Sequence, residues 1–119
     1  MGIFQRITAP PDQLRAQEVR KSCTHIERVQ QIAECRIRSR PRVAGVVQSI
    51  TIDPRTQPPT LRVEIYDGTE EIVGVWYGRR EIPGVELGHP LVLEGTVRRN
   101  SEGGFEIMNP AYELVPEEA

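Results

Sequence analysis

Four arginines alternate with other residues just ahead of the most β-branched part of the chain, at Arg36, Arg38, Arg40 and Arg42. If this segment is extended, all four guanidinium groups project from one face, because successive side chains of a strand point to opposite sides. Guanidinium groups make planar, bidentate contacts with phosphates. The row is therefore suited to line a nucleic-acid backbone. The alternative interpretation is a solvated strand edge whose arginines pair with the protein's own acids.

Two tyrosines, Tyr66 and Tyr77, are candidate platforms on which bases could stack. Alternation along their segments predicts that both point outwards, together with Arg62, while Trp76 points into the core. The other basic residues expected near this face are Arg79, Arg80, Arg98 and Arg99. The alternative is that these arginines pair across strands with Glu64, Glu70, Glu71 and Glu94, and that the tyrosines are half-buried strand aromatics.

The chain carries few residue patterns that indicate catalysis or metal binding. It has no G-x-S-x-G motif, no P-loop and no G-x-G-x-x-G motif, and its two histidines have no evident nucleophile partner. Cys23, His25 and Cys35 offer at most one close pair of ligands, with His89 far away, whereas structural zinc sites use two close pairs. The sequence therefore predicts a protein that is not an enzyme, with no metal and no cofactor, whose cysteines pack in the core.

The length of 119 residues predicts one domain plus at most a terminal appendage. No run of 18 apolar residues is present, the chain start lacks a signal-type apolar region, and two cysteines do not suggest a disulfide scaffold. We expect a cytoplasmic protein without a membrane partner. Residues 1–42 hold nine basic and four acidic residues, whereas residues 43–119 hold six basic and thirteen acidic ones. A basic arm is thus joined to an acidic body.

The elements that carry these side chains change type along the chain. Residues from about 10 to 31 contain no glycine. Within them an apolar stripe recurs at three- to four-residue spacing, at Ala16, Val19, Cys23 and Ile26. This spacing predicts an amphipathic helix with a narrow apolar stripe, which docks on another part of the protein or on a second copy.

From residue 43 onward the pattern is typical of short strands separated by turns. Gly45 predicts a bulge or bend, and Asp67-Gly68 predicts a hairpin. The five expected strands are 43–52, 61–66, 72–77, 91–97 and 105–108. We expect a mainly β chain, a five-stranded OB-fold barrel preceded by an N-terminal α-helix, with an SH3-like barrel as the alternative. The helical arm would comprise residues 1–34 and the barrel domain residues 35–119.

Several segments together carry a resemblance to a known family. They are Val43-Ala-Gly45-Val-Val, Ile65-Tyr-Asp-Gly68-Thr, Val75-Trp-Tyr-Gly-Arg-Arg80, Leu93-Glu-Gly-Thr-Val97 and Asn109-Pro-Ala-Tyr-Glu-Leu114. This pattern resembles the OB wedge domain of fork-remodelling, RecG-type helicases. It resembles more closely the small stand-alone actinobacterial proteins described as OB-fold nucleic-acid-binding domain proteins. Departures from that pattern are Glu70, Glu71 and Gly74, of which the two glutamates add negative charge beside the hairpin.

Two classes of function follow from these observations. The first is a non-catalytic domain that binds single-stranded or junction nucleic acid weakly, through arginine–phosphate contacts and aromatic stacking. The second is a protein-interaction domain that docks on a partner through its acidic barrel or through the helix stripe. Self-association through the amphipathic helix, giving a homo-oligomer, is a third interpretation.

Overall fold

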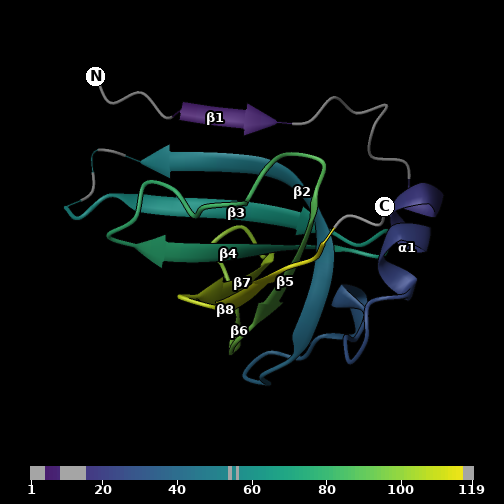
Figure 1. Ribbon diagram of the computed structural model, residues 1–119. Coiled ribbons are helices and arrows are strands. Elements are labelled where there is room, and N and C mark those ends of the chain that lie inside the picture. Colours follow the sequence, from purple (N-terminus) through teal and green to yellow (C-terminus); the bar gives the residue numbers. More distant parts are fainter. Residues whose placement is uncertain (1–4, 9–15, 54, 56, 117–119) are drawn as a thin grey trace.

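The protein is mainly β, with one α-helix at one end of a curled sheet (Figure 1). The computed structural model describes residues 5–8, 16–53, 55 and 57–116. The elements are β1 (Gln5–Thr8), α1 (Ala16–Thr24), the short 3-10 helix η2 (Ile32–Glu34), β2 (Arg42–Asp53), β3 (Thr60–Tyr66), β4 (Glu71–Tyr77), β5 (Pro90–Glu94), β6 (Val97–Arg99), β7 (Phe105–Met108) and β8 (Ala111–Leu114). No described helix is long and apolar enough to cross a membrane.

Seven strands follow one another in the order β6-β7-β4-β3-β2-β5-β8, and β1 pairs with β2 beside this path. All pairs are antiparallel except β4 with β7, which is parallel. The expectation of a mainly β chain with an N-terminal helix is confirmed, but the predicted count of five strands is not matched. The predicted strand 91–97 is divided into β5 and β6, and both β1 and β8 lie outside the predicted strands.

Local backbone constraints explain the interruptions that divide these strands. At Gly95, between β5 and β6, an added Cβ would lie 2.5 Å from the side chain of Ile107. Between β7 and β8, Asn109 adopts a positive φ of 47° and Pro110 has no N–H to give to a ladder. Position 95 therefore has no room for a side chain, and the backbone at Asn109 and Pro110 separates β7 from β8.

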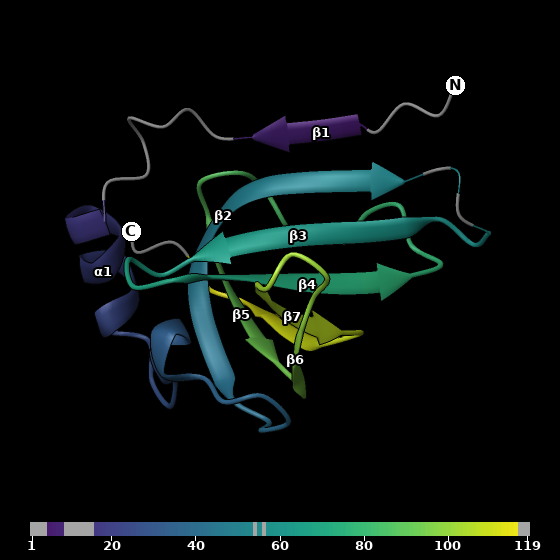
Figure 2. The same ribbon diagram turned by 180° about the vertical axis from the view of Figure 1, so that it is seen from behind.

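The long strand β2 curves so that its two halves pair with different strands, as Figure 2 shows. Its first half pairs with β5 and its second half with β3 and β1. The register with β3 shifts between Val47 and Ser49, which is a β-bulge. At Gly45 an added Cβ would lie 2.9 Å from backbone atoms of Tyr66. The bend predicted at this glycine is therefore a close approach of two backbones, and the bulge follows three residues later.

The main core lies inside the curl and is built by the alternation predicted from the sequence. Leu61, Val63 and Ile65 of β3 are buried, as are Ile72 and Trp76 of β4. Each such aliphatic side chain contributes about 1.5–3 kcal/mol when buried. The indole N–H of Trp76 donates a hydrogen bond 3.2 Å long to the Pro110 carbonyl. The prediction that Trp76 belongs to the core is confirmed.

A second, smaller core joins the helix to the sheet. Val19 and Cys23 of α1 are buried with Val46, and the half-buried Tyr66 packs against them. The predicted apolar stripe of the helix therefore packs on the sheet at its central residues, whereas Ala16 at its start is exposed. The part of the predicted helix before residue 16 lies outside the described residues. Because β1 pairs with β2, the segment 1–34 is not helical throughout.

A buried carboxylate fixes the helical segment to the hairpin between β3 and β4. Asp67 is 1% exposed, and its Oδ2 accepts hydrogen bonds from the Ile32 amide at 2.8 Å and the Arg20 guanidinium at 3.2 Å. Its Oδ1 accepts from the amide and hydroxyl of Thr69 and from the amide of Glu70. One side chain thus connects α1, η2 and the predicted Asp67-Gly68 hairpin.

Candidate nucleic-acid interface

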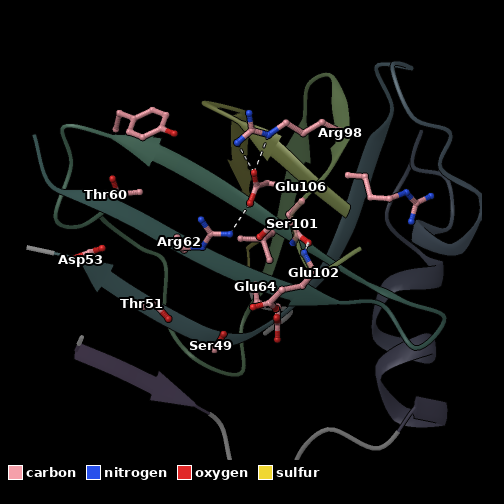
Figure 3. A pocket seen from close by; sticks show the side chains of 14 residues that line it. Ser49, Thr51, Asp53, Thr60, Arg62, Glu64, Arg98, Ser101, Glu102 and Glu106 are labelled. Atoms are coloured by element: carbon pink, nitrogen blue, oxygen red, sulfur yellow. Dashed lines mark hydrogen bonds and ion pairs between the residues drawn. The ribbon is translucent and has the colours of Figure 1, made fainter. Parts of the chain in front are cut away.

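An open groove crosses the outer face of β2, β3 and β4 and is walled by the turn between β6 and β7 (Figure 3). Its volume is about 870 Å³, which is within the range of small-ligand sites. We call this feature the groove. The residues that line it are Ser49, Thr51, Asp53, Thr60, Arg62, Glu64, Val73, Tyr77, Arg98, Arg99, Asn100, Ser101, Glu102 and Glu106.

Strand alternation explains why polar side chains reach the groove. In β3 the buried positions 61, 63 and 65 alternate with the groove residues Thr60, Arg62 and Glu64. The turn that forms the wall is fixed by Asn100, whose Oδ1 accepts hydrogen bonds from the amides of Glu102 and Gly104 at 2.9 Å each. The sheet and the turn therefore hold the groove in place without help from a ligand.

A buried glutamate lies at the centre of the groove between two arginines. Glu106 on β7 is 2% exposed. Its Oε2 accepts a hydrogen bond from Arg62 at 2.5 Å, and its Oε1 accepts two from Arg98, at 2.5 and 2.8 Å. These contacts, with a smaller one from Tyr77, raise the pKa of Arg98 above its usual value. Two guanidinium groups share one carboxylate, so the cluster has one positive charge in excess.

The remaining charges of the groove are mixed. In Figure 3, Arg98, Glu106 and Arg62 form a row, and Glu64 and Glu102 lie to one side of it. The Glu64 carboxylate accepts a hydrogen bond from the Gln48 amide. At the far end, Asp53 is paired with Arg55, which holds the pKa of the Asp53 carboxyl below its usual value. The basic residues that line the groove therefore lie on β3 and β6.

The structure does not bring the two predicted stacking tyrosines together. Tyr77 is 51% exposed, lines the groove and lies opposite Thr60. Tyr66 lies opposite Glu71, at the other end of the same strand pair, about 20 Å away by strand geometry. It packs against α1 and does not line the groove. Tyr77 is thus the aromatic side chain that the groove presents.

The row of arginines predicted at residues 36–42 does not form. Only Arg42 lies in a strand, and its guanidinium donates to Glu113 at 2.7 Å. Arg38 has a positive φ of 74°, and the Ser39 amide donates back to the Arg36 carbonyl, so the segment turns where an extended strand was expected. The four guanidinium groups therefore do not project from one strand face.

The remaining predicted arginines fall into two groups. Arg62, Arg98 and Arg99 line the groove, and the Arg99 guanidinium also lies 5.7 Å from the ring centre of Phe105. Arg79 and Arg80 are exposed in the loop after β4 and do not line it. The expected pairing of arginines with glutamates across strands is present at Glu106, although a different set of glutamates was expected to provide it.

Sequence reasoning missed Glu106, the central acid of the groove. One signal for it is present, since Glu106 is a charged residue between apolar neighbours in a short strand, Phe105–Met108. A charge at such a position is buried only when it is paired. Its pairing with Arg98 is local, across the β6–β7 hairpin, whereas its pairing with Arg62 depends on the parallel alignment of β7 with β4, which local spacing does not indicate.

Neither cysteine is placed for chemistry. Both are buried free thiols. Burial, followed by the nearby charge of Asp67, raises the pKa of Cys23 and of Cys35 to about 11. A thiol binds metals and attacks electrophiles as the thiolate, so these thiols are poor ligands and poor nucleophiles at neutral pH. Among the described residues no group of three His, Cys, Asp or Glu side chains could hold a metal ion.

Comparison of the chain with protein-family models, with curated proteins and with solved structures finds no match.

Proposed function

We propose that the curled sheet is a five-stranded OB-type barrel in which two strands are interrupted. In this interpretation β5 and β6 form one strand and β7 and β8 form another. The pairings of β2 with both β3 and β5, the parallel pairing of β4 with β7, and the pairings β5–β8 and β6–β7 support it. OB barrels bind oligonucleotides on the strand face on which the groove lies.

We further propose that the groove binds single-stranded nucleic acid weakly and without catalysis. The single observation that carries this proposal is the Arg62–Glu106–Arg98 cluster beside the exposed Tyr77. Glu106 orients both guanidinium groups, and one positive charge remains available for phosphate. Tyr77 offers a ring face on which one base stacks. The buried, reduced thiols fit the cytoplasmic location that we propose.

The size of these contributions determines how tight the binding is. Stacking of one base contributes about 1–3 kcal/mol. Contacts between arginine and phosphate add a contribution to the affinity that decreases as salt is added. For a single strand, the logarithm of the binding constant falls with the logarithm of the salt concentration by a slope of about 0.7 for each phosphate neutralised. With one aromatic platform and few free charges, the expected dissociation constant is micromolar or weaker. The four acids that line the groove repel phosphate and therefore keep the binding from being tighter.

The proposal is tested by titrating a labelled single-stranded oligonucleotide with the protein at about 50 and about 200 mM salt. Tyr77→Ala is expected to weaken binding by about fivefold or more with an unchanged salt slope, because stacking depends little on salt. Arg98→Gln is expected to lower the salt slope by about 0.7, the value for one lost phosphate contact on a single strand. Tyr112→Ala, which changes an exposed tyrosine outside the groove, is the matched control. If tens of micromolar protein do not bind at low salt, the proposal is wrong.

A protein-docking function is the second candidate, and one observation favours it. Strand β8 ends the strand path, and its Tyr112 and Leu114 are 38% and 42% exposed. The helix stripe does not serve this purpose in the monomer, because Val19 and Cys23 are buried against the sheet. A pull-down from nuclease-treated lysate tests this candidate: a partner lost on Leu114→Ser and retained on Tyr77→Ala would favour docking over nucleic-acid binding.

A further inference from the structure

The segment from Arg36 to Pro41, which we call the arginine segment, is held against β6. The amide of Arg38 donates to the Val97 carbonyl at 2.7 Å, and the Val97 amide donates to the Ser39 carbonyl at 2.9 Å. A longer bond, at 3.4 Å, connects the Gly95 amide to the Pro41 carbonyl. Figures 1 and 2 both show the chain ahead of β2 passing beside β6. The segment therefore adds a further row to the sheet beyond β6.

The side chains of the arginine segment alternate in exposure. Pro41 is buried and Ser39 is half-buried, whereas Arg40 between them is exposed. Ser39 is bonded to Val97, which points into the core. By alternation, Arg40 therefore belongs to the opposite face, the one that carries Arg98. The groove and the arginine segment are thus parts of one surface, separated by β6.

The cations of the arginine segment are less compensated than those of the groove. Arg36, Arg38 and Arg40 are exposed, and none of them forms an ion pair with a residue that the structure describes. In contrast, Arg62 and Arg98 share Glu106. The nearest acid along the chain is Glu34, in η2, and across the strands Glu94 lies opposite Arg42. The segment is therefore the more positive of the two parts.

The backbone of the arginine segment is fixed in an unusual conformation. A positive φ, as at Arg38, is uncommon for a residue other than glycine and persists where surrounding bonds hold it. The bonds to Val97 and the hydroxyl bond from Ser39 to the Arg36 carbonyl hold it here. The position of the guanidinium-bearing backbone is thus set before any ligand binds, which lowers the entropy that binding would cost.

We propose that the arginine segment is a second phosphate-binding element, onto which a single strand bound in the groove continues. This inference rests on the proposed function of the groove. The strand would stack on Tyr77, contact Arg62 and Arg98, cross β6 and then bring its phosphates to Arg38 and Arg40. From β4 across β7 and β6 to the arginine segment there are three inter-strand spacings, which together measure about 15 Å. Ligands too short to cross that distance bind the groove alone.

The test compares short and long oligonucleotides, of about four and about twelve thymidines, which represent the range of sites found on single OB domains. For the wild-type protein, affinity is expected to increase with length. The variant Arg38→Asn with Arg40→Ser keeps a residue that tolerates a positive φ at position 38. It is expected to bind the short ligand as wild type does and to lose most of the gain for the long one.

The salt dependence gives a second readout. Two lost phosphate contacts lower the slope for the long ligand by about 1.4, so that its loss of affinity between about 50 and about 200 mM salt is about sevenfold smaller. The control variant Arg79→Ser with Arg80→Ser removes the same charge from an exposed loop outside both elements and should keep the wild-type slope. Denaturant unfolding of each variant confirms that it is folded.

The outcomes separate the two proposals. If the Arg38→Asn, Arg40→Ser variant binds the long ligand with the affinity and salt slope of the wild-type protein, the inference is wrong, whereas the proposed function of the groove is unaffected. Equal losses for the short and the long ligand would also overturn it, because the segment would then act on the groove itself. If the wild-type protein binds neither ligand, the proposed function fails first and the inference fails with it.

Discussion

Two buried carboxylates, Asp67 and Glu106, have different kinds of partner. Asp67 is 1% exposed and accepts hydrogen bonds from three backbone amides, one hydroxyl and one guanidinium. Glu106 is 2% exposed and accepts only from guanidinium groups, those of Arg62 and Arg98. Equal burial therefore does not mean an equal role.

The difference is in what each carboxylate holds. Backbone amides cannot leave, so the Asp67 carboxylate fixes the positions of main-chain segments and its removal leaves donors buried without partners. The arginines around Glu106 are 40% and 52% exposed in their side chains, so their remaining N–H groups reach solvent or a ligand. Asp67 is a structural connection, and Glu106 sets the charge and orientation of a surface.

The largest expected effect is that of Asp67→Asn on stability. The amide retains the size of the carboxylate, but it removes the negative charge beside Arg20 and places an NH2 donor against N–H and O–H groups that also donate. We expect the free energy of unfolding to fall by about 3 kcal/mol, measured by urea denaturation. Glu71→Gln, an exposed change on the same hairpin, should cost less than about 0.5 kcal/mol. A cost for Asp67→Asn as small as that of the control would contradict the structural role.

Alkaline pH provides the next largest effect, in the region around Asp67. The pKa of Cys23 and of Cys35 is raised from the ordinary value of 9.0 to about 11. The folded protein therefore keeps thiol protons that the unfolded chain releases. This stability is fully present below pH 9 and is lost as pH rises through about 11, by about 1–2 kcal/mol for each thiol.

Unfolding measured at several alkaline pH values checks this expectation. Cys23→Ala removes one of the two thiols, so its stability should depend less steeply on pH than that of the wild-type protein. An identical pH dependence of the two proteins would show that the Cys23 thiol does not contribute.

A smaller effect is expected for Glu106→Gln on binding in the groove. The glutamine oxygen still accepts from one guanidinium group, whereas its NH2 faces the donors of the other, and the negative charge between them is gone. The salt slope for a single-stranded oligonucleotide should increase by about 0.7, so that the gain in affinity over the wild-type protein is about threefold larger at about 50 mM than at about 200 mM salt. Glu81→Gln, in the exposed loop after β4, is the control with the same change of charge. Weaker binding by Glu106→Gln would mean that orientation of the arginines outweighs their free charge.

The smallest effect is that of Glu113→Ala. The Glu113 carboxylate is 61% exposed and pairs with Arg42 at 2.7 Å. Exposed ion pairs contribute little, so unfolding free energy should change by less than about 0.5 kcal/mol, as measured by denaturation. A loss of 2 kcal/mol or more would show that exposure alone does not distinguish this carboxylate from Asp67.

Local patterns predicted most of the secondary structure. The alternation of Leu61, Val63 and Ile65 with polar residues predicted both the strand β3 and the face that it buries. Asp67-Gly68 predicted the hairpin, and the stripe through Val19 and Cys23 predicted a docked helix. These predictions succeed because each depends on the spacing of neighbouring residues and on a periodicity of two or 3.6.

The candidate site was harder to predict because its parts are far apart in the sequence. Arg98 and Glu106 are eight residues apart and face each other across the β6–β7 hairpin, but Arg62 reaches Glu106 only because β7 also pairs with β4. Tyr66 and Tyr77 share a predicted orientation but lie at opposite ends of two antiparallel strands. The arginines at 36–42 were expected in a row, but the bonds to Val97 impose a turn that their alternation does not indicate.

The sequence alone determined which side chains alternate between core and surface, where the chain turns, and that basic residues concentrate ahead of an acidic body. These properties come from local periodicity and composition, which neighbouring residues carry. Only the tertiary structure decided which acid lies between which arginines, which tyrosine α1 covers, and that the arginine segment borders β6. Those relations depend on strand order and register, which are set by the packing of the whole core.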